Sequence, residues 1–316
     1  MSTNATVAPA VLAASKKKDV HRGHRMRLAT GYVIAIAFVL ALVVYGYDYY
    51  PLGAADRAFS PKHALLRPSG SIGLKLGFLG FAMFLVIFLY PLRKRWTWLS
   101  KQGSSRHWLD NHVLLGLAAP FVIAFHASFK FRGFAGTAFW LMLAVSLSGI
   151  IGRYLYGQIP CSLNAAELSL RELRDTQEVL AQRLSEKDLL PEADLRALLR
   201  LPTRERVQRL SIITALVYMM VLDLSRVFRI ARLRRHALGF GEKLSTLGGL
   251  LPTRHDELEK AIRMAREEAA TAKRVLFLAR AQQVFHLWHV VHKPFSYAFA
   301  ALVLVHIVVA SLLGFV

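Results

Sequence analysis

The sequence predicts an all-α membrane protein with about five transmembrane helices and a helical insertion between the fourth and the fifth. Of the 316 residues 54% are hydrophobic, and the mean hydropathy is +0.37. Five apolar runs are each long enough to cross an apolar core of about 30 Å. These features predict a flexible basic N-terminal arm at 1–27, transmembrane helices one to four within 28–156, the insertion at 157–284, and transmembrane helix five within 285–316.

The charge and cysteine content exclude several classes of protein. The formal net charge is +21, which the positive-inside rule and attraction to anionic lipid account for. Because no nucleic-acid-reading motif accompanies this charge, we expect no nucleic-acid binding. The single cysteine, Cys161, excludes a disulfide framework, a thiolate-ligated iron–sulfur cluster and a covalent haem-attachment motif. The first apolar run follows basic residues and has no convincing cleavage site, so it predicts an uncleaved anchor.

Hydropathy places the spans, and aromatic and small residues support the placement. The five tryptophans all fall at expected span ends, as interfacial aromatic belts require. The second span carries Gly73, Gly77 and Gly80, a small-residue stripe that predicts close contact with a neighbouring helix. The expected spans are Leu28–Tyr47, Ile72–Tyr90, Trp108–Phe129, Thr137–Tyr156 and Leu287–Leu313.

The distribution of Lys and Arg predicts the orientation. The arm holds six of them, and the loop between spans two and three holds five, namely Arg93, Lys94, Arg95, Lys101 and Arg106. The intervening loop at 48–71 is longer but holds only three. The N-terminus is therefore predicted to be cytoplasmic, and spans three and five both run from the cytoplasmic to the outer surface.

The insertion shows helical periodicity among alternating charges, which predicts a cytoplasmic helical hairpin or small bundle. One stretch contains regularly spaced leucines (Leu168, Leu170, Leu173, Leu180 and Leu184), and a second extends from Asp256 to Gln283. The segment from Ser211 to Leu224 is apolar but short for a span and contains Asp223. A sixth span there would place five arginines outside, so we interpret the segment as the buried face of a cytoplasmic helix.

Spans three and five carry histidines at the same spacing. His112 and His126 lie fourteen residues apart on one, and His292 and His306 lie fourteen apart on the other. In an α-helix this spacing gives a rise of about 21 Å and a rotation about 40° short of four turns, so each pair shares one face. The predicted orientation places His112 and His292 at the cytoplasmic level. Paired neutral imidazoles are suited to the two axial positions of haem iron, which predicts an inner haem b at His112 and His292 and an outer one at His126 and His306.

Other residues near these histidines have two interpretations. Arg106 and Lys293 near the inner ligands, and Lys130 and Arg132 near the outer ones, either bind haem propionates or snorkel to the interface. Gly116, one turn after His112, either makes room for a porphyrin face or packs against a helix. Pro120 and Pro294, beside the ligands, are expected to kink or locally unwind their helices.

At the inner end of span four, Arg153 with Tyr154 and Tyr156 forms either a quinone or propionate pocket or an ordinary interfacial border. His289 competes with His292 as a ligand, but its spacing makes it face away from the outer site. Outside the spans, histidines in charged or loop surroundings are expected to be solvated, including His24 and His63.

The paired histidines, with Lys293-Pro294 after the inner ligand, resemble the membrane di-haem cytochrome b superfamily over 107–156 and 286–313. That superfamily includes cytochrome b subunits of quinol-oxidising complexes and the membrane domain of ferric reductases. The resemblance implies two b haems that carry electrons across the bilayer. The large insertion departs from a compact four-helix cytochrome, and no Gly-x-Gly-x-x-Gly motif for a nicotinamide or flavin domain is present.

The leading hypothesis is an electron-transfer subunit of a membrane oxidoreductase complex in the bacterial inner membrane. It would contact lipid and redox partner proteins on both faces, with a c-type cytochrome as the outer candidate and a quinone as an alternative donor or acceptor. The rival hypothesis is a non-redox membrane scaffold or sensor that works through the insertion. A transporter is disfavoured because no confident span holds an Asp or Glu deep in the membrane.

Overall fold

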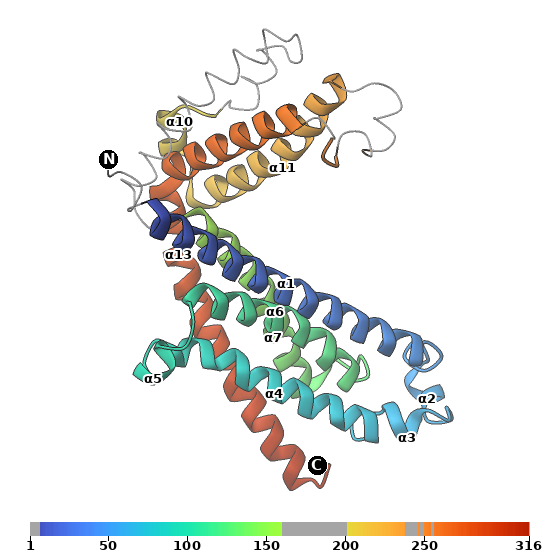
Figure 1. Cartoon of the computed structure of the whole chain (residues 1–316). Helices are drawn as coiled ribbons and strands as arrows, with labels where there is room; N and C mark the ends of the chain where they lie inside the picture. Colours follow the sequence, from blue (N-terminus) through green and yellow to red (C-terminus); the bar gives the residue numbers. More distant parts are fainter. Residues whose placement is uncertain (1–6, 160–200, 238–245, 247–249, 254–255, 316) are drawn as a thin grey trace, which may run out of the picture. The chain divides into compact units, whose positions relative to one another are not determined.

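The computed structural model describes residues 7–159, 201–237, 246, 250–253 and 256–315, with side chains from residue 23 onward except 236, 237, 257 and 261. All regular elements among these residues are helices, drawn in sequence order in Figure 1. Within the described residues, five helices are long and apolar enough to cross a membrane, as predicted for a multi-pass, all-α protein. They are Gly23–Tyr45, His63–Arg93, Ser105–His126, Gly133–Gln158 and Leu258–Leu312.

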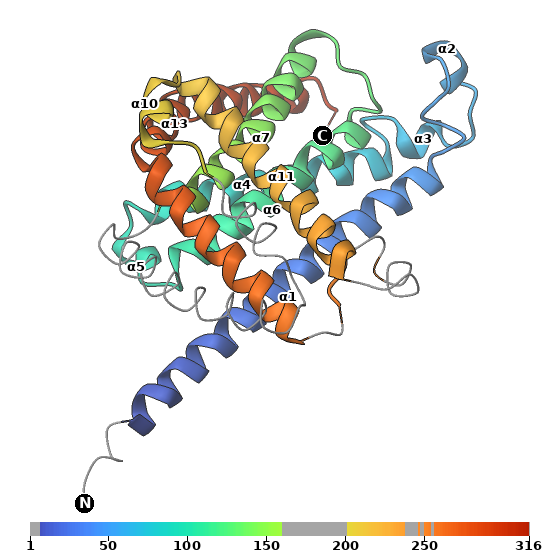
Figure 2. The same cartoon turned by 90° about the horizontal axis from the view of Figure 1, so that it is seen from above.

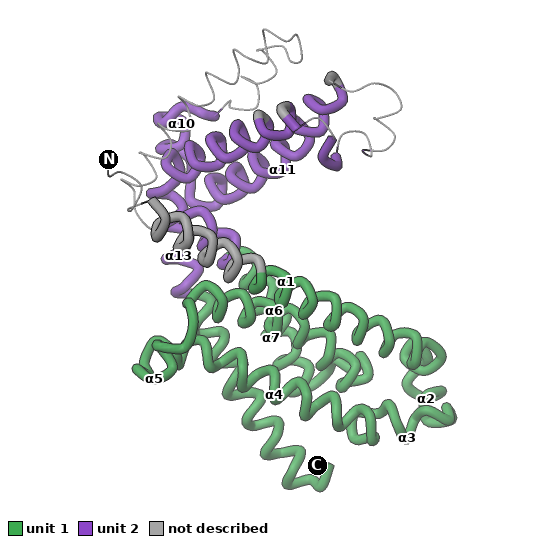
Figure 3. The backbone as a smooth tube through the Cα atoms, viewed as in Figure 1, with its two compact units in different colours: residues 1–151, 291–316 green, residues 152–290 purple. Residues whose placement is uncertain are grey.

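The chain divides into two compact units, coloured separately in Figure 3. Unit 1 consists of 1–151 and 291–316, and unit 2 consists of 152–290. The long helices are α1 (Val7–Tyr45), α4 (Ser71–Arg93), α6 (Ser105–His126), α7 (Gly133–Gln158), α11 (Ile212–Ala237) and α13 (Asp256–Leu312). The short ones are α2 (Ala54–Arg57), α3 (His63–Leu66), α5 (Thr97–Ser100) and α10 (Arg204–Arg209).

The membrane helices agree with the expected spans to within a few residues, except at the start of the first and the last. α1 begins at Val7, so most of the basic N-terminal segment is helical, and the expected flexibility of the arm stays a prediction. α13 has 57 residues, which corresponds to a length of about 85 Å, so only its apolar C-terminal part has the length of one membrane crossing. Both α6 and α13 stay helical through Pro120 and Pro294.

The core of unit 1 lies among α4, α6 and α7. α6 packs against both α4 and α1 (Figure 1). The buried cluster consists of Leu76, Met83, Ala119, Val122, Ala124, Phe125, Phe139 and Met142. Many large apolar side chains on the outer faces of these helices are exposed, as expected for helices that contact lipid.

The predicted glycine stripe on α4 lies at close contacts. A Cβ added at Gly80 would collide with Ile123 of α6, and one added at Gly77 would collide with His126 of α6. At Gly73 the obstacle is the backbone of Arg67, in the connection before α4. Gly77 and Gly80 therefore let α4 approach α6 closely, which confirms the expected contact between these helices.

A buried arginine anchors the loop between α1 and α4. Arg57 donates from Nε to the Leu52 carbonyl at 2.9 Å, from Nη1 to the Ser128 carbonyl at 2.5 Å, and from Nη2 to the Tyr50 carbonyl. Ser128 is itself fully buried and donates to the Leu66 carbonyl at 2.6 Å. Together these bonds fix the end of α6, which terminates at His126.

In unit 2, α11 lies beside the first half of α13, as the two views in Figures 1 and 2 agree. The apolar segment Ser211–Leu224 falls almost entirely within α11, and its inner side joins Met219 and Leu222 with Phe277 and Ala281 of α13 in one buried cluster. α11 is not among the five helices identified as candidate membrane spans in the described residues. The interpretation as a buried helix face holds only for the side with Met219 and Leu222, because Ile213, Val217 and Leu224 are exposed, and the cytoplasmic location stays a prediction. The periodic leucines at 168–184 lie outside the described residues.

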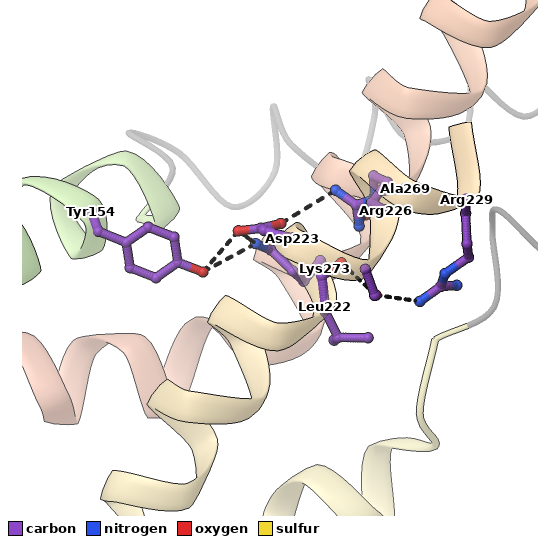
Figure 4. Close-up of polar contacts among 8 residues, drawn as sticks. Tyr154, Leu222, Asp223, Arg226, Arg229, Ala269 and Lys273 are labelled. Atoms are coloured by element: carbon purple, nitrogen blue, oxygen red, sulfur yellow. Dashed lines mark hydrogen bonds and ion pairs between the residues drawn. The ribbon is translucent and has the colours of Figure 1, made fainter. Parts of the chain in front are cut away.

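A charged network joins three helices of unit 2 (Figure 4). Asp223 of α11 accepts the Tyr154 hydroxyl at 2.8 Å and the Lys273 ammonium at 2.5 Å, both on Oδ2. Arg226 lies 3.4 Å from the other carboxylate oxygen and donates to the Ala269 carbonyl at 3.2 Å. Burial lowers the pKa of the Arg226 guanidinium, and the Asp223 charge opposes that shift. One carboxylate therefore compensates two buried cations, of which Lys273 is only 2% exposed.

We predict that Asp223→Ala destabilises the protein by about 3 kcal/mol, because it leaves Lys273 and Arg226 buried without their counter-charge. The measurement is the unfolding midpoint of the detergent-purified protein. The matched control is Asp48→Ala, which breaks the exposed Asp48–Lys62 pair of 2.7 Å and should cost less than about 1 kcal/mol. Equal effects of the two substitutions would contradict the role given to the network.

Candidate functional site

The two histidines of α6 direct the same ring nitrogen at backbone carbonyls of α4. Nδ1 of His112 lies 3.0 Å from the Ile87 carbonyl oxygen, and Nδ1 of His126 lies 2.8 Å from the Gly73 carbonyl oxygen. A carbonyl oxygen can only accept, so Nδ1 must carry the hydrogen in both imidazoles. The lone pair of each neutral ring is then on Nε2, which is the state required of a metal ligand.

Pro91 explains why the Ile87 carbonyl is available. In a regular helix this carbonyl would accept the N–H of residue 91, but proline has no N–H. The same arrangement occurs in α6, where Pro120 leaves the Gly116 carbonyl without its helical donor and Ser146 of α7 donates to it at 2.7 Å. Two prolines within membrane helices thus free backbone acceptors that tertiary hydrogen bonds then use.

His126 also fits closely against α4. A Cβ at Gly77 would lie 2.8 Å from Cε1 and 2.9 Å from Nδ1 of the His126 ring, closer than carbon and nitrogen atoms normally approach. Glycine is therefore required at this position for the imidazole to keep its place. On the other histidine, the Tyr90 ring centroid lies 5.2 Å from that of His112. Both rings of α6 are thus positioned by α4.

His292 of α13 has its partner on α7. Its Nδ1 lies 2.7 Å from the Ser148 hydroxyl, which in turn donates to the Val145 carbonyl at 2.8 Å. When the hydroxyl hydrogen is used in that bond, Ser148 accepts from His292, and Nδ1 carries the hydrogen as in the two histidines of α6. Three of the four predicted ligands therefore use Nδ1 in a hydrogen bond to a neighbouring helix, and in His112 and His126 the carbonyl acceptor places the lone pair on Nε2.

The two outer histidines lie within electrostatic range of each other. His306 is half-buried on α13 and lies close enough to His126 of α6 to interact with it electrostatically. The inner pair is connected through α7, where Ser148 binds His292 and Ser146 binds the backbone of α6 at Gly116, one turn from His112. α7 therefore contacts both ligand helices at the level of the inner pair.

Two glycines lie next to free space at this level. A Cβ added at Gly116 or at Gly149, the residue after Ser148, would meet no heavy atom within 4 Å, although both residues are half-buried. Room beside His112 and His292 suits a flat macrocycle whose iron takes one imidazole from each side. The donor set, the tautomers and this space therefore fit haem b, while packing against lipid remains the alternative for each glycine.

The residues predicted to bind haem propionates or a quinone show fewer specific contacts than the histidines. Arg106, Lys130, Arg132 and Lys293 are all exposed, so their contact with propionates stays a prediction. Arg153 is half-buried within unit 2. The neighbouring Tyr154 hydroxyl binds Asp223, which assigns it to the charged network rather than to an open pocket. A quinone site at these residues also stays a prediction.

Several contacts near the histidines were not predictable from the sequence. His24 was expected to be solvated, but its Nε2 lies 3.0 Å from the buried Asp110 carboxylate and its ring stacks on His107 at 3.7 Å. His63 similarly lies 3.1 Å from the buried Tyr49 hydroxyl. Both partners are separated from the histidines in sequence, so periodicity does not reveal them. Pro91, in contrast, is visible in the sequence and indicates that the Ile87 carbonyl, which His112 binds, lacks its usual helical donor.

Comparisons with known proteins give no independent assignment: no protein-family model, no curated protein and no solved structure matches this chain. Within the part of the chain that the structure describes, no group of three or more His, Cys, Asp or Glu side chains is arranged to hold a metal ion. The functional interpretation therefore depends on the pairs of histidines and their hydrogen bonds.

We predict that Gly77→Val displaces the His126 ring and breaks its bond to the Gly73 carbonyl. The measurement is ¹⁵N NMR of histidine-labelled protein without added cofactor, with His126 assigned from a His126→Ala sample. The native ring should show a protonated Nδ1 and an unprotonated Nε2, and the variant should lose this single-tautomer signature. Overpacking should also cost about 2 kcal/mol of stability.

The control for this experiment is Gly149→Ala on α7, because its added Cβ meets no heavy atom within 4 Å. It should leave the His126 signals unchanged and stabilise its helix by roughly 0.5–1 kcal/mol. An unaltered His126 signature in Gly77→Val would show that the ring does not lie against α4.

Proposed function

We propose that the chain is a transmembrane electron-transfer subunit, a b-type cytochrome with two bis-histidine haems. His112 and His292 would hold the inner haem, and His126 and His306 the outer one. The observation that carries the proposal is the common hydrogen bonding of Nδ1 in His112, His126 and His292, each of which lies 2.7–3.0 Å from an oxygen of a neighbouring helix. Iron-ligating histidines generally donate their second ring nitrogen in this way, which orients the ring and raises the basicity of Nε2.

The arrangement favours electron transfer over binding of a small substrate. Haem supplies the one-electron chemistry, and the protein's contribution is to hold two imidazoles opposite each other at each level. A haem iron held by two of these imidazoles would have no coordination position left for oxygen. The rise of about 21 Å between the two histidines of one helix would place the sites toward opposite membrane surfaces.

The partners follow from this placement. We propose that the protein lies in the bacterial inner membrane with its N-terminus in the cytoplasm, as the Lys and Arg distribution predicts. Electrons would pass between a cytoplasmic-side or quinone donor or acceptor and a protein on the outer face, such as a c-type cytochrome. Unit 2 would then belong to the cytoplasmic insertion and would bind a partner within a larger complex.

We predict that the purified protein shows a Soret band, a reduced α-band and two protohaems per chain by pyridine haemochrome analysis. His112→Ala and His292→Ala should each remove the same haem, and His126→Ala and His306→Ala the other. His286→Ala is the control, because His286 is exposed and its replacement should leave the haem content unchanged. Absence of protohaem, or unchanged content in all four ligand variants, would overturn the proposal.

We predict that Ser148→Ala raises the reduction potential of the inner haem alone. Without its acceptor, the Nδ1–H of His292 no longer adds electron density to the ring, which disfavours the oxidised iron. A hydrogen bond of about 1 kcal/mol corresponds to roughly 40 mV for one electron. The measurement is a spectroelectrochemical titration of both haems.

Ser146→Ala is the matched control on the same helix. Its hydroxyl binds the Gly116 carbonyl rather than a histidine, so this variant should lose a little stability without a change in either potential. Identical titration curves for Ser148→Ala and the unmodified protein would remove Ser148 from the support of the inner ligand.

A further inference from the structure

The helices α11 and α13 of unit 2 expose faces of opposite chemistry. Between residues 256 and 278 of α13, every described side chain that is exposed is charged: Asp256, Lys260, Arg263, Arg266, Glu267 and Arg274. Between residues 213 and 228 of α11, the exposed side chains carry no charge: Ile213, Thr214, Val217, Met220, Val221, Leu224, Val227 and Phe228. The two helices therefore suit different surroundings, water for α13 and an apolar phase for α11.

The seven large apolar residues of this set form one stripe, hereafter the α11 stripe. They recur at intervals of three and four residues, so they share one side of the helix over about 22 Å. Their exposure is high, reaching 71% at Ile213 and 61% at both Leu224 and Phe228. An uninterrupted exposed row of this size marks a surface that something apolar contacts.

The stripe points away from α13. The opposite side of α11 supplies Met219 and Leu222 to the buried cluster with Phe277, and Arg226 binds the α13 backbone. Packing within the hairpin therefore already uses the inner side of α11. A different apolar surface must therefore contact the α11 stripe.

Charges at both ends of the stripe indicate what that contact is. Before α11 lie the exposed Arg204, Arg206 and Arg209, and after the stripe lie the exposed Arg232 and Arg235. An apolar helix face flanked by arginines is typical of a helix that lies in the headgroup region of an anionic bilayer. A second copy of the stripe would instead bring two sets of arginines together, which is electrostatically unfavourable.

The start of α11 lies next to an apolar segment of α13. Ile212 lines a groove together with residues of α13, among which the polar Gln282, Gln283 and His286 are followed by the apolar Leu287 and Val290. The N-terminal end of α11 thus lies beside the part of α13 where its apolar C-terminal run begins. We propose that the α11 stripe inserts into the interfacial region of an anionic membrane, with the charged face of α13 in water.

Site-directed spin labelling tests the proposal on the full chain. The native cysteine is removed by Cys161→Ser, and single labels are introduced by Val217→Cys or Leu224→Cys on the stripe and by Arg263→Cys or Arg274→Cys on α13. The protein is reconstituted in vesicles of phosphatidylcholine with phosphatidylglycerol. Power saturation then compares the access of oxygen, which concentrates in lipid, with that of a water-soluble nickel chelate.

The expected result is a reversal between the two faces. Labels at 217 and 224 should relax more with oxygen than with nickel, and labels at 263 and 274 more with nickel than with oxygen. Greater nickel access at 217 and 224 would place the stripe in water and overturn the proposal. Protection of these labels from both reagents would show that protein covers the stripe, which would overturn it equally.

Discussion

Hydrogen bonding of the buried imidazoles is the constraint on which the arrangement of α4, α6 and α7 depends. An imidazole N–H without a partner is costly in an apolar phase, and neighbouring helices must supply the acceptor. His112 and His126 obtain theirs from the backbone of α4, and His292 obtains one from Ser148 of α7. Each bond needs an acceptor at one particular depth, so the bonds fix the relative register of the helices as well as the ring positions.

The local sequence itself makes these carbonyl acceptors available. A helix normally uses its own carbonyls, but Pro91 and Pro120 release those of Ile87 and Gly116 for contacts with other helices. Gly77 lets the ring of His126 lie against the helix that holds it. Residues that would weaken an isolated helix thus strengthen the packing between helices, because lipid offers the released carbonyls no alternative donor.

Hydropathy predicted the helical class and the membrane helices because apolar length is a property of each segment alone. The face shared by His112 and His126 was predictable for the same reason, since it depends only on helical rotation. The partners were not predictable in this way: Ser148 contacts His292 across 144 residues, and His24 contacts Asp110 across 86. Such pairs are decided by how helices pack, although Pro91 and Pro120 carried a local signal that backbone acceptors would be released.

The paired histidines of unit 1 and the charged network of unit 2 place polar groups inside the protein in different ways. The contacts of His112, His126 and His292 in unit 1 are neutral, because each Nδ1 lies against a backbone or hydroxyl oxygen, which avoids the cost of placing a charge in lipid. Unit 2 instead buries Lys273 and Arg226 around the partly exposed Asp223, where water can reduce the cost of the carboxylate. A neutral site keeps its imidazole lone pairs for coordination, whereas a charged cluster neutralises itself and has stability as its effect. The chemistry of this chain is therefore to be sought among the neutral histidines of the membrane helices.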